Sequence, residues 1–279
     1  MKLGGLIRSH YSSPEEWGAL LKASRFAAII CPIDHTTSPD VAHTYFKEAA
    51  RLGVTIAEIG VWKNPLSPDM EERKEALDYA KAQLAFADEM GVPCCVNIVG
   101  SRGKIWDGAY RDNYLPETYD AIIESVRDII DTVNPKCCRY TIEPMPWMVP
   151  DGPDEYLQLI KDIDRPMFGA HLDFVNMINS PKRYLFANEF IDECFKKLGP
   201  HIISCHIKDI TLDPTLTVLL HEVAPGAGAL DFRHILHSAD RLLRKDMPFL
   251  LEHMHTDSEY AAAYAHIAAI ADQEHIAIR

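Results

Sequence analysis

Residues 118–144, TYDAIIESVRDIIDTVNPKCCRYTIEP, contain the pattern that decides the fold. From Tyr119 to Val133, apolar residues recur at a spacing of about 3.6, which predicts an amphipathic helix. Asn134-Pro135 then ends that helix, because proline cannot continue it. The apolar run from Cys138 to Glu143 has the length and composition of a buried strand. The stretch is therefore predicted to form one helix–strand unit.

The same kind of unit recurs along the chain. Helical spacing is also found over residues 77–87, 190–198 and 232–243, the last with Asp231 as its N-cap. Short apolar runs alternate with these helices, and several are apolar almost throughout, as expected of parallel strands that are covered on both faces. The eight predicted strands are Lys2–Arg8, Phe26–Ile33, Val54–Val61, Val92–Val99, Cys138–Glu143, Met167–Phe174, Ile202–Lys208 and Pro248–Glu252.

Eight strand–helix units in 279 residues predict an α/β protein of the (β/α)₈ TIM-barrel class, with one domain over residues 1–279. No linker, low-complexity segment or change of composition marks a domain boundary. A doubly wound open sheet is the alternative. Such a sheet usually has a glycine-rich turn after its first strand, and SHYSSPEEW at 9–17 is not one.

Composition and charge narrow the functional classes. Hydrophobic residues make up 47% of the chain and charged residues 25%, as in ordinary globular proteins. Lys and Arg number 28 against 41 Asp and Glu, and the net charge of −13 disfavours binding to nucleic-acid phosphates. No apolar run approaches the about 20 residues that span a bilayer, and the N-terminus lacks a signal-peptide pattern. We therefore expect no nucleic-acid or membrane partner and a cytoplasmic location.

The seven cysteines are expected to be reduced and buried. Cys94-Cys95 and Cys137-Cys138 are adjacent pairs within apolar runs, and no C-x-x-C occurs. Strand alternation directs the two members of each pair to opposite faces. Neither pair is then expected to form a disulfide or to bind one metal ion.

Four consecutive predicted strands end in residues of metal-binding type. Active sites of barrels lie at the carboxyl ends of the strands, so Glu143, Asp173, His206 and Glu252 are expected to converge there. A single carboxylate at such a position is more often a helix cap, and a single histidine is more often a core residue. Four of them in consecutive strands favour a shared site. Three carboxylates and one imidazole suit Mn²⁺, Mg²⁺ or Co²⁺ better than structural Zn²⁺.

Five strings lie in order along the second half of the chain: IEP at 142–144, HLDFVNM at 171–177, HIKD at 206–209, PGAGALDF at 225–232 and LLEH at 250–253. Through them the chain resembles the xylose-isomerase-like barrels, a group of sugar phosphate isomerases and epimerases that includes ketose 3-epimerases, inosose dehydratases and endonuclease IV. The resemblance follows the strand order over essentially the whole chain. It implies one divalent ion, Mn²⁺ first and Mg²⁺, Co²⁺ or Zn²⁺ as alternatives, bound by the four residues above. It also implies that the protein acts in carbohydrate metabolism and that it associates with itself into a homo-oligomer.

The resemblance implies a mechanism as well. The ion binds the carbonyl and a neighbouring hydroxyl of a keto sugar or sugar phosphate and acts as a Lewis acid. Glu143 and Glu252 are the catalytic acid/base pair. One removes the proton beside the carbonyl to give a metal-stabilised enediolate, and the other returns a proton. Return to the opposite face is epimerisation, and return to the adjacent carbon is isomerisation.

Other functions of the same scaffold stay open at this stage. A lyase or dehydratase acting on a keto-cyclitol or keto-sugar would begin with the same proton abstraction. Asn176 stands where the group often has a histidine that contacts substrate in epimerases and binds a second metal in endonuclease IV. Asn97 stands where endonuclease IV needs a histidine, so a nuclease is disfavoured. The full set of four ligands argues against a non-catalytic binding subunit.

Six further residues are candidates for substrate binding. Lys208 lies two residues after His206, so it is expected on the same inward face, where it suits a carboxylate, a phosphate or an oxyanion. Trp62 would stack on a sugar, with packing at the barrel rim as the alternative. Loop 102–116 is expected to act as a lid, and a proline-rich loop is expected to place Trp147 over the site. The other four candidates are Asn176, Glu58, His10 and Arg102.

Overall fold

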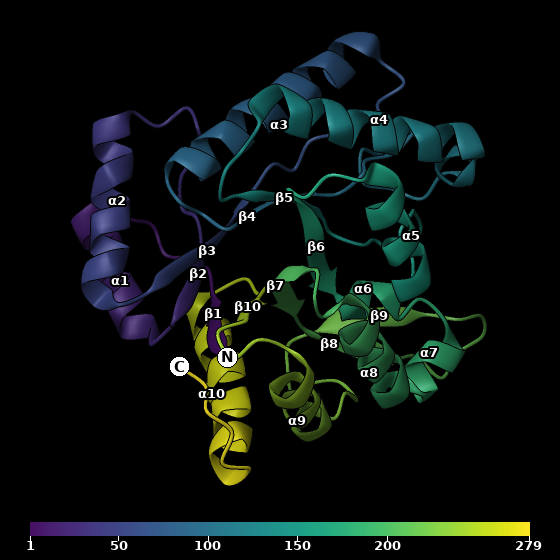
Figure 1. Cartoon of the computed structure of the whole chain (residues 1–279). Helices are drawn as coiled ribbons and strands as arrows, with labels where there is room; N and C mark the ends of the chain where they lie inside the picture. Colours follow the sequence, from purple (N-terminus) through teal and green to yellow (C-terminus); the bar gives the residue numbers. More distant parts are fainter.

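Eight strands form a closed parallel barrel in the computed structural model of the chain, which describes residues 1–279 (Figure 1). Strands that follow one another along the chain pair side by side, and β1 closes the barrel by pairing with β10. The predicted (β/α)₈ class and its eight strands are confirmed. Around the barrel lie β1 (Lys2–Gly5), β2 (Ala28–Ile30), β3 (Thr55–Gly60), β4 (Cys94–Asn97), β5 (Arg139–Ile142), β6 (Phe168–Asp173), β7 (Ile202–Ile207) and β10 (Pro248–Leu251).

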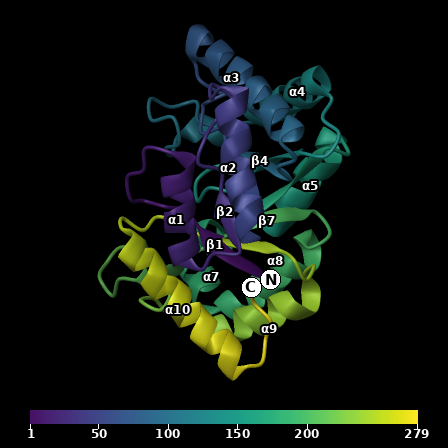
Figure 2. The same ribbon diagram turned by 90° about the vertical axis from the view of Figure 1, so that its left-hand side faces the viewer.

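Helices cover the outside of the barrel, and Figure 2 shows α1, α2 and α10 across one side of it. The predicted start and stop signals operate as expected: Asp231 caps the first turn of α9, and Asn134 adopts a left-handed conformation at the end of α4. The two chain ends lie together, joined by hydrogen bonds from the Arg279 N–H to the Met1 carbonyl and from the Leu3 N–H to the Arg279 carbonyl. The helices are α1 (Pro14–Ser24), α2 (Pro39–Leu52), α3 (Met70–Glu89), η1 (Arg111–Tyr114), α4 (Pro116–Val133), α5 (Pro153–Ile163), α6 (Phe174–Met177), α7 (Pro181–Leu185), α8 (Ala187–Leu198), α9 (Phe232–Leu242) and α10 (Asp257–Gln273).

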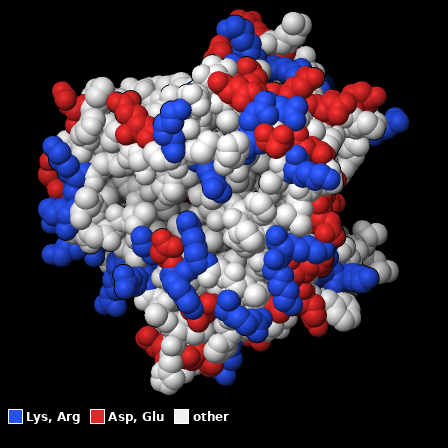
Figure 3. Space-filling model, in the orientation of Figure 1, with Lys and Arg blue, Asp and Glu red and all other residues white.

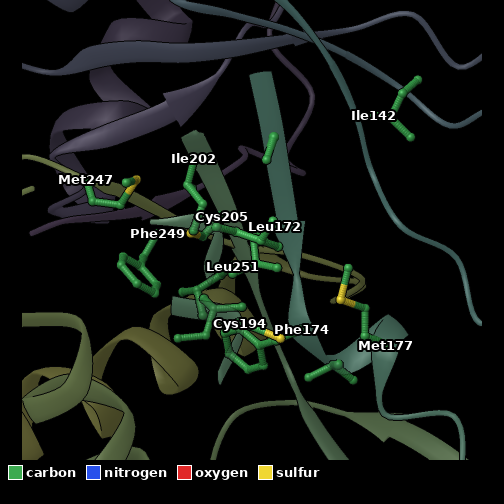
Figure 4. Close-up of a cluster of buried hydrophobic side chains, with 14 of the residues drawn as sticks. Ile142, Leu172, Phe174, Met177, Cys194, Ile202, Cys205, Met247, Phe249 and Leu251 are labelled. Carbon is green, nitrogen blue, oxygen red and sulfur yellow. The ribbon is translucent and has the colours of Figure 1, made fainter. Parts of the chain in front are cut away.

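Alternation along the strands separates an outer apolar layer from the barrel interior. Leu172, Cys205 and Leu251 lie on three neighbouring strands and pack with Phe174 and Cys194 of the helical layer (Figure 4). These residues belong to one cluster of 62 buried side chains. Because successive side chains of a strand point to opposite faces, the neighbours of the three strand residues face the inside of the barrel. The polar residues of β6 and β7, and Glu252 directly after β10, are placed there.

The sequence did not predict the antiparallel hairpin of β8 (Asp209–Leu212) and β9 (Leu220–Val223), which follows the carboxyl end of β7. Its strands are only four residues long, and the burial pattern of β9 shows no buried face, so no alternation marked it. The hairpin adds polar side chains above the barrel.

The cysteines are all unpaired, and Cys94 and Cys95 belong to different core clusters, as strand alternation predicted. The expectation that all are buried is wrong for Cys137, which is exposed where the chain enters β5, and for Cys31, which is half-buried. On the molecular face drawn in Figure 3, basic and acidic side chains lie among one another. No helix combines the length and the apolar character that crossing a membrane requires.

Candidate metal centre

The structure brings Glu143, Asp173, His206 and Glu252 together at the carboxyl ends of β5, β6, β7 and β10. All four are buried, and one potential ligand atom of each lies within 4.8 Å of those of the other three. Nδ1 of His206 is 2.7 Å from Oε2 of Glu252 and 3.0 Å from Oε1 of Glu143. Three carboxylates and one imidazole nitrogen thus share one small volume.

Lys208 places its ammonium group among these carboxylates. Its Nζ lies 2.9 Å from Oδ2 of Asp173, 2.7 Å from Oε1 of Glu252 and 3.0 Å from Oε2 of Glu222. Burial by itself would lower the pKa of Lys208, but the surrounding carboxylates outweigh it and raise that pKa well above its ordinary value. The pKa of His206 is also raised, because Glu252 and its neighbours outweigh the desolvation of the ring.

The carboxylates of the group differ in their titration. Burial raises the pKa of Asp173 to about 7, and Glu252 and Glu143 add to the shift while Lys208 opposes it. Burial acts on Glu252 in the same direction, but His206 and Lys208 hold the pKa of Glu252 well below its usual range. The positive charges of Lys208 and His206 therefore favour the ionised form of both Asp173 and Glu252.

The donor set fits a divalent cation. Oδ2 of Asp173 and Oε1 of Glu252 are buried and accept no hydrogen bond, because the nearby Lys208 ammonium does not meet hydrogen-bond geometry toward either. Buried carboxylate oxygens without a hydrogen bond are rare and costly. A hard cation would give both of them a partner besides the Lys208 ammonium, and oxygen-rich sites with one imidazole suit Mn²⁺, Mg²⁺ or Co²⁺.

Glu58 lies beneath these residues, inside the barrel. It is fully buried, and its carboxylate contacts His206, His171 and Ser204. Burial would raise the pKa of Glu58, but His206 and His171 bring it well below the ordinary value. The predicted substrate contact of Glu58 is wrong in position, because the residue does not line the cavity: a shift of register beside Ala57 turns it into the barrel.

A cavity of about 1140 Å³ opens above the four candidate ligands. Glu143, His206 and Glu252 form part of its lining. Trp62 also lines it and is 39% exposed, so its indole is available to a ligand. The loops carrying Trp106 and Trp147 border the cavity as well, and they are joined by a hydrogen bond of 2.7 Å from Trp147 Nε1 to the Asp107 carbonyl.

Of three other residues predicted to contact substrate, only Asn176 lines the cavity, and Arg102 and His10 do not. Asn176 lines the cavity and donates from Nδ2 to Oε1 of Glu143 at 3.4 Å and to the Pro144 carbonyl at 3.1 Å. Arg102 does not reach the cavity, because its guanidinium binds the Leu66 carbonyl and the Thr118 hydroxyl. His10 is exposed outside the cavity. The backbone N–H groups of Arg8 and Ser9, just before it, donate to the carboxylate of Asp257.

Sequence reasoning missed Glu222 and gave no site role to His171. Glu222 comes from β9, and its Oε1 lies 2.6 Å from Nδ1 of His253 while its Oε2 contacts Lys208. Burial would raise the pKa of Glu222, but His253 and Lys208 lower it to about 2. The only signal for Glu222 would have been the unpredicted hairpin. His171 was visible two residues before Asp173, on the same face of its strand.

Residues 25–271 match the family described as the Xylose isomerase-like TIM barrel. The chain belongs to this family. None of the curated proteins matches its sequence. The expected resemblance to xylose-isomerase-like barrels is therefore confirmed at the level of the family.

Solved structures of similar fold cover nearly the whole chain. A Xylose isomerase-like TIM barrel protein from Mycobacterium smegmatis in complex with magnesium is 18% identical, with a TM-score of 0.69 and 96% of each chain covered. D-psicose 3-epimerase with D-tagatose from Clostridium cellulolyticum H10 is 15% identical, with a TM-score of 0.71 and coverage of 97% of this chain and 99% of that one. L-ribulose 3-epimerase is 14% identical, with a TM-score of 0.72 and coverage of 98% and 95%. At these identities the likeness shows the fold.

Proposed function

We propose that the protein is a divalent-metal-dependent isomerase or epimerase of a keto sugar or sugar phosphate. The observation that carries the proposal is the buried set of Glu143, Asp173, His206 and Glu252, whose ligand atoms lie within 4.8 Å of one another below an open cavity. Family membership and the structural likeness to sugar 3-epimerases support it. Mn²⁺ is the proposed ion, and Mg²⁺, Co²⁺ and Zn²⁺ are the alternatives.

The residues of the chain divide the chemistry between them. A bound ion would polarise the substrate carbonyl and the neighbouring hydroxyl. Glu143 and Glu252 approach the same nitrogen of His206 from β5 and β10, so a carbon held above that point is within reach of both carboxylates. One takes the proton beside the carbonyl and the other gives a proton back. Asn176 orients Glu143 through its amide, and Trp62 offers an apolar face to the sugar.

A second candidate function is a lyase that removes water from a keto-cyclitol or keto-sugar. The observation that favours it is the pair of Glu222 and His253 beside Glu252. His253 lines the cavity, and its hydrogen bond with Glu222 raises its pKa, so it is suited to protonate a leaving hydroxyl. Proton abstraction by a glutamate would be common to both functions.

Incubation of the metal-loaded protein with keto sugars and inososes in D₂O tests the proposal. Deuterium beside the carbonyl without loss of water, detected by NMR and mass spectrometry, supports the isomerase or epimerase. A dehydrated enone or diketone supports the lyase. The chelator-treated protein is the control and should exchange nothing. Absence of exchange with each of the four ions over the whole set of substrates would overturn both functions.

A further inference from the structure

We propose that Glu58 is a positioning residue for the metal centre, which holds His206 in the tautomer whose Nδ1 is free to bind the ion. The inference rests on the proposed metal site. The two ring nitrogens of His206 face different partners. Nδ1 points to Glu143 and Glu252, while Nε2 lies 2.8 Å from Oε1 of Glu58.

Those contacts decide where the ring proton belongs. A neutral imidazole carries one N–H and one lone pair, and a metal ion binds the lone pair. The Glu58 carboxylate accepts hydrogen bonds, so the N–H of His206 is required at Nε2. When an ion displaces the Nδ1 proton that Glu143 and Glu252 accept in the metal-free chain, the Nε2 proton stays directed at Glu58 and the lone pair of Nδ1 faces the space shared with the carboxylates of Glu143 and Glu252. A carboxylate behind a metal-binding histidine also increases the basicity of the nitrogen that binds the ion.

Glu58 is itself fixed by two further partners on its other oxygen. Oε2 lies 2.7 Å from the Ser204 hydroxyl, which donates to it, and 3.0 Å from Nε2 of His171. Nδ1 of His171 is buried without a partner, which is the cheaper arrangement when that atom carries the lone pair and Nε2 carries the proton. The carboxylate therefore meets donors at both oxygens and has no freedom to turn away from His206.

The strands that carry Glu58 and Ser204, β3 and β7, each contain a bulge next to that residue. Ile29 pairs with Ile56 but Ile30 pairs with Glu58, so β3 contains one extra residue just before Glu58. An extra residue likewise interrupts the pairing of β6 with β7, between Ile202 and Ser204. Bulges of this kind turn side chains toward an active site. Here they turn Glu58 on one strand and Ser204 on the other into the same interior space.

The packing of the rings adds to the restraint. The rings of His171 and His206 meet edge to face, with centroids 4.1 Å apart.

Glu58, His171 and His206 also form a group whose ligand atoms lie within 4.8 Å of one another, so an ion bound among them is the competing interpretation. An ion in that group would bind Nε2 of His206, whereas an ion in the proposed metal site would bind Nδ1. That difference is measurable.

The first test uses the wild-type chain, labelled with ¹⁵N at histidine and loaded with ¹¹³Cd²⁺ as the probe. We expect one-bond coupling of cadmium to Nδ1 of His206 and a slowly exchanging proton on its Nε2. Coupling through Nε2 would overturn the inference and place the ion in the lower group. If the wild-type chain takes up neither Cd²⁺ nor any other divalent ion, the proposed metal site itself fails.

The second test compares Zn²⁺ affinity between wild type and Glu58→Gln by competition with a chromophoric chelator. The amide has only one oxygen, so it cannot accept from His206 and from the His171–Ser204 side together, and affinity should fall about 10- to 100-fold. Gln83→Leu is the control, since it removes the buried hydrogen bonds of Gln83 to His35 and Gly60 without touching His206. It should lower the unfolding temperature and leave Zn²⁺ affinity unchanged. Equal affinity of Glu58→Gln and wild type would overturn the inference and leave the metal site intact.

Discussion

The ammonium nitrogen of Lys208 lies 2.9 Å from Oδ2 of Asp173, within the group of carboxylates that we propose to bind a metal ion. The same ammonium contacts Glu252 at 2.7 Å. Lysine and a bound ion would thus neutralise the same negative charges. In the absence of an ion, the lysine compensates for carboxylates that are otherwise costly to bury.

The first prediction concerns Lys208→Met. Removing one partner of a buried ion pair typically costs about 3–5 kcal/mol, so the metal-free variant should be less stable than wild type by about that amount. A divalent ion should then raise the unfolding temperature of the variant more than that of wild type, because the ion no longer competes with the ammonium. Calorimetric scans with Mn²⁺ and with chelator measure both effects. Lys182→Met, at an exposed site, is the control, and equal metal-induced shifts in Lys208→Met and wild type would contradict the prediction.

The second prediction concerns the two glutamates of the proposed proton transfer. Glu143→Gln and Glu252→Gln should each lower metal-dependent deuterium exchange into the substrate by at least about 100-fold, since an amide cannot accept the proton. NMR in D₂O measures the exchange, with Glu124→Gln on the exposed side of α4 as the matched control. Exchange that persists in the double variant would refute the assigned roles.

The third prediction concerns the loop 225–232, which Asp209 holds in place. Oδ2 of Asp209 accepts from the backbone N–H groups of Gly226 and Gly228, and Oδ1 accepts from that of Leu230, each at 3.0 Å. Asp209→Ala should cost about 2–4 kcal/mol of the free energy of unfolding, because one buried and two part-buried hydrogen bonds lose their charged acceptor. A Cβ on Gly228 would lie 2.2 Å from Oδ1 of Asp209, so Gly228→Ala should disrupt the same bonds.

Urea unfolding of the two single variants and the double variant tests this third prediction. If both substitutions act through the same bonds, the double variant should be less destabilised than the sum of the two single variants. Additive losses would show that the glycine and the aspartate act independently.

The sequence was sufficient for the barrel because its strands are buried on both faces and its helices keep a 3.6-residue period, both of which are local patterns. It was also sufficient to select Glu143, Asp173, His206 and Glu252, since each follows an apolar run whose end lies at the same edge of a parallel barrel. Alternation then placed Lys208 on the inward face with His206. These features follow from rules that extend over a few residues.

The features that the sequence did not predict depend on departures from those rules. Glu58 was expected at the cavity because it lies near the end of its strand, but the bulge beside it turns its carboxylate into the barrel interior, toward His206 and His171. Glu222 enters from a hairpin too short to leave a periodic signal. Arg102 is engaged by backbone and side-chain oxygens that only the folded chain brings near it. Each of these positions is set by tertiary contacts.

The last prediction concerns Asp88, which joins the end of α3 to the start of β5. Its Oδ1 accepts from the backbone N–H groups of Lys136, Cys137 and Cys138 at 2.8, 2.7 and 2.8 Å. Burial would raise the pKa of Asp88, but these hydrogen bonds outweigh it and lower the pKa to about 2. Because the unfolded chain has the ordinary aspartate pKa of about 3.9, the contribution of Asp88 to stability is complete above that value and is lost as the pH falls toward about 2.

Urea unfolding of wild type and Asp88→Asn at pH 7 and pH 3 measures this contribution. The difference in free energy of unfolding between wild type and Asp88→Asn should be smaller at pH 3 than at pH 7 by about 1 kcal/mol. At pH 3, Asp88 is mostly protonated in the unfolded wild-type chain and still mostly ionised in the folded chain. Solvent screening at this partly exposed carboxylate keeps the effect at that size. Asp120→Asn, on the exposed side of α4, should leave the pH dependence unchanged. A difference between wild type and Asp88→Asn that is the same at both pH values would show that the ionised carboxylate is not what the three N–H groups require.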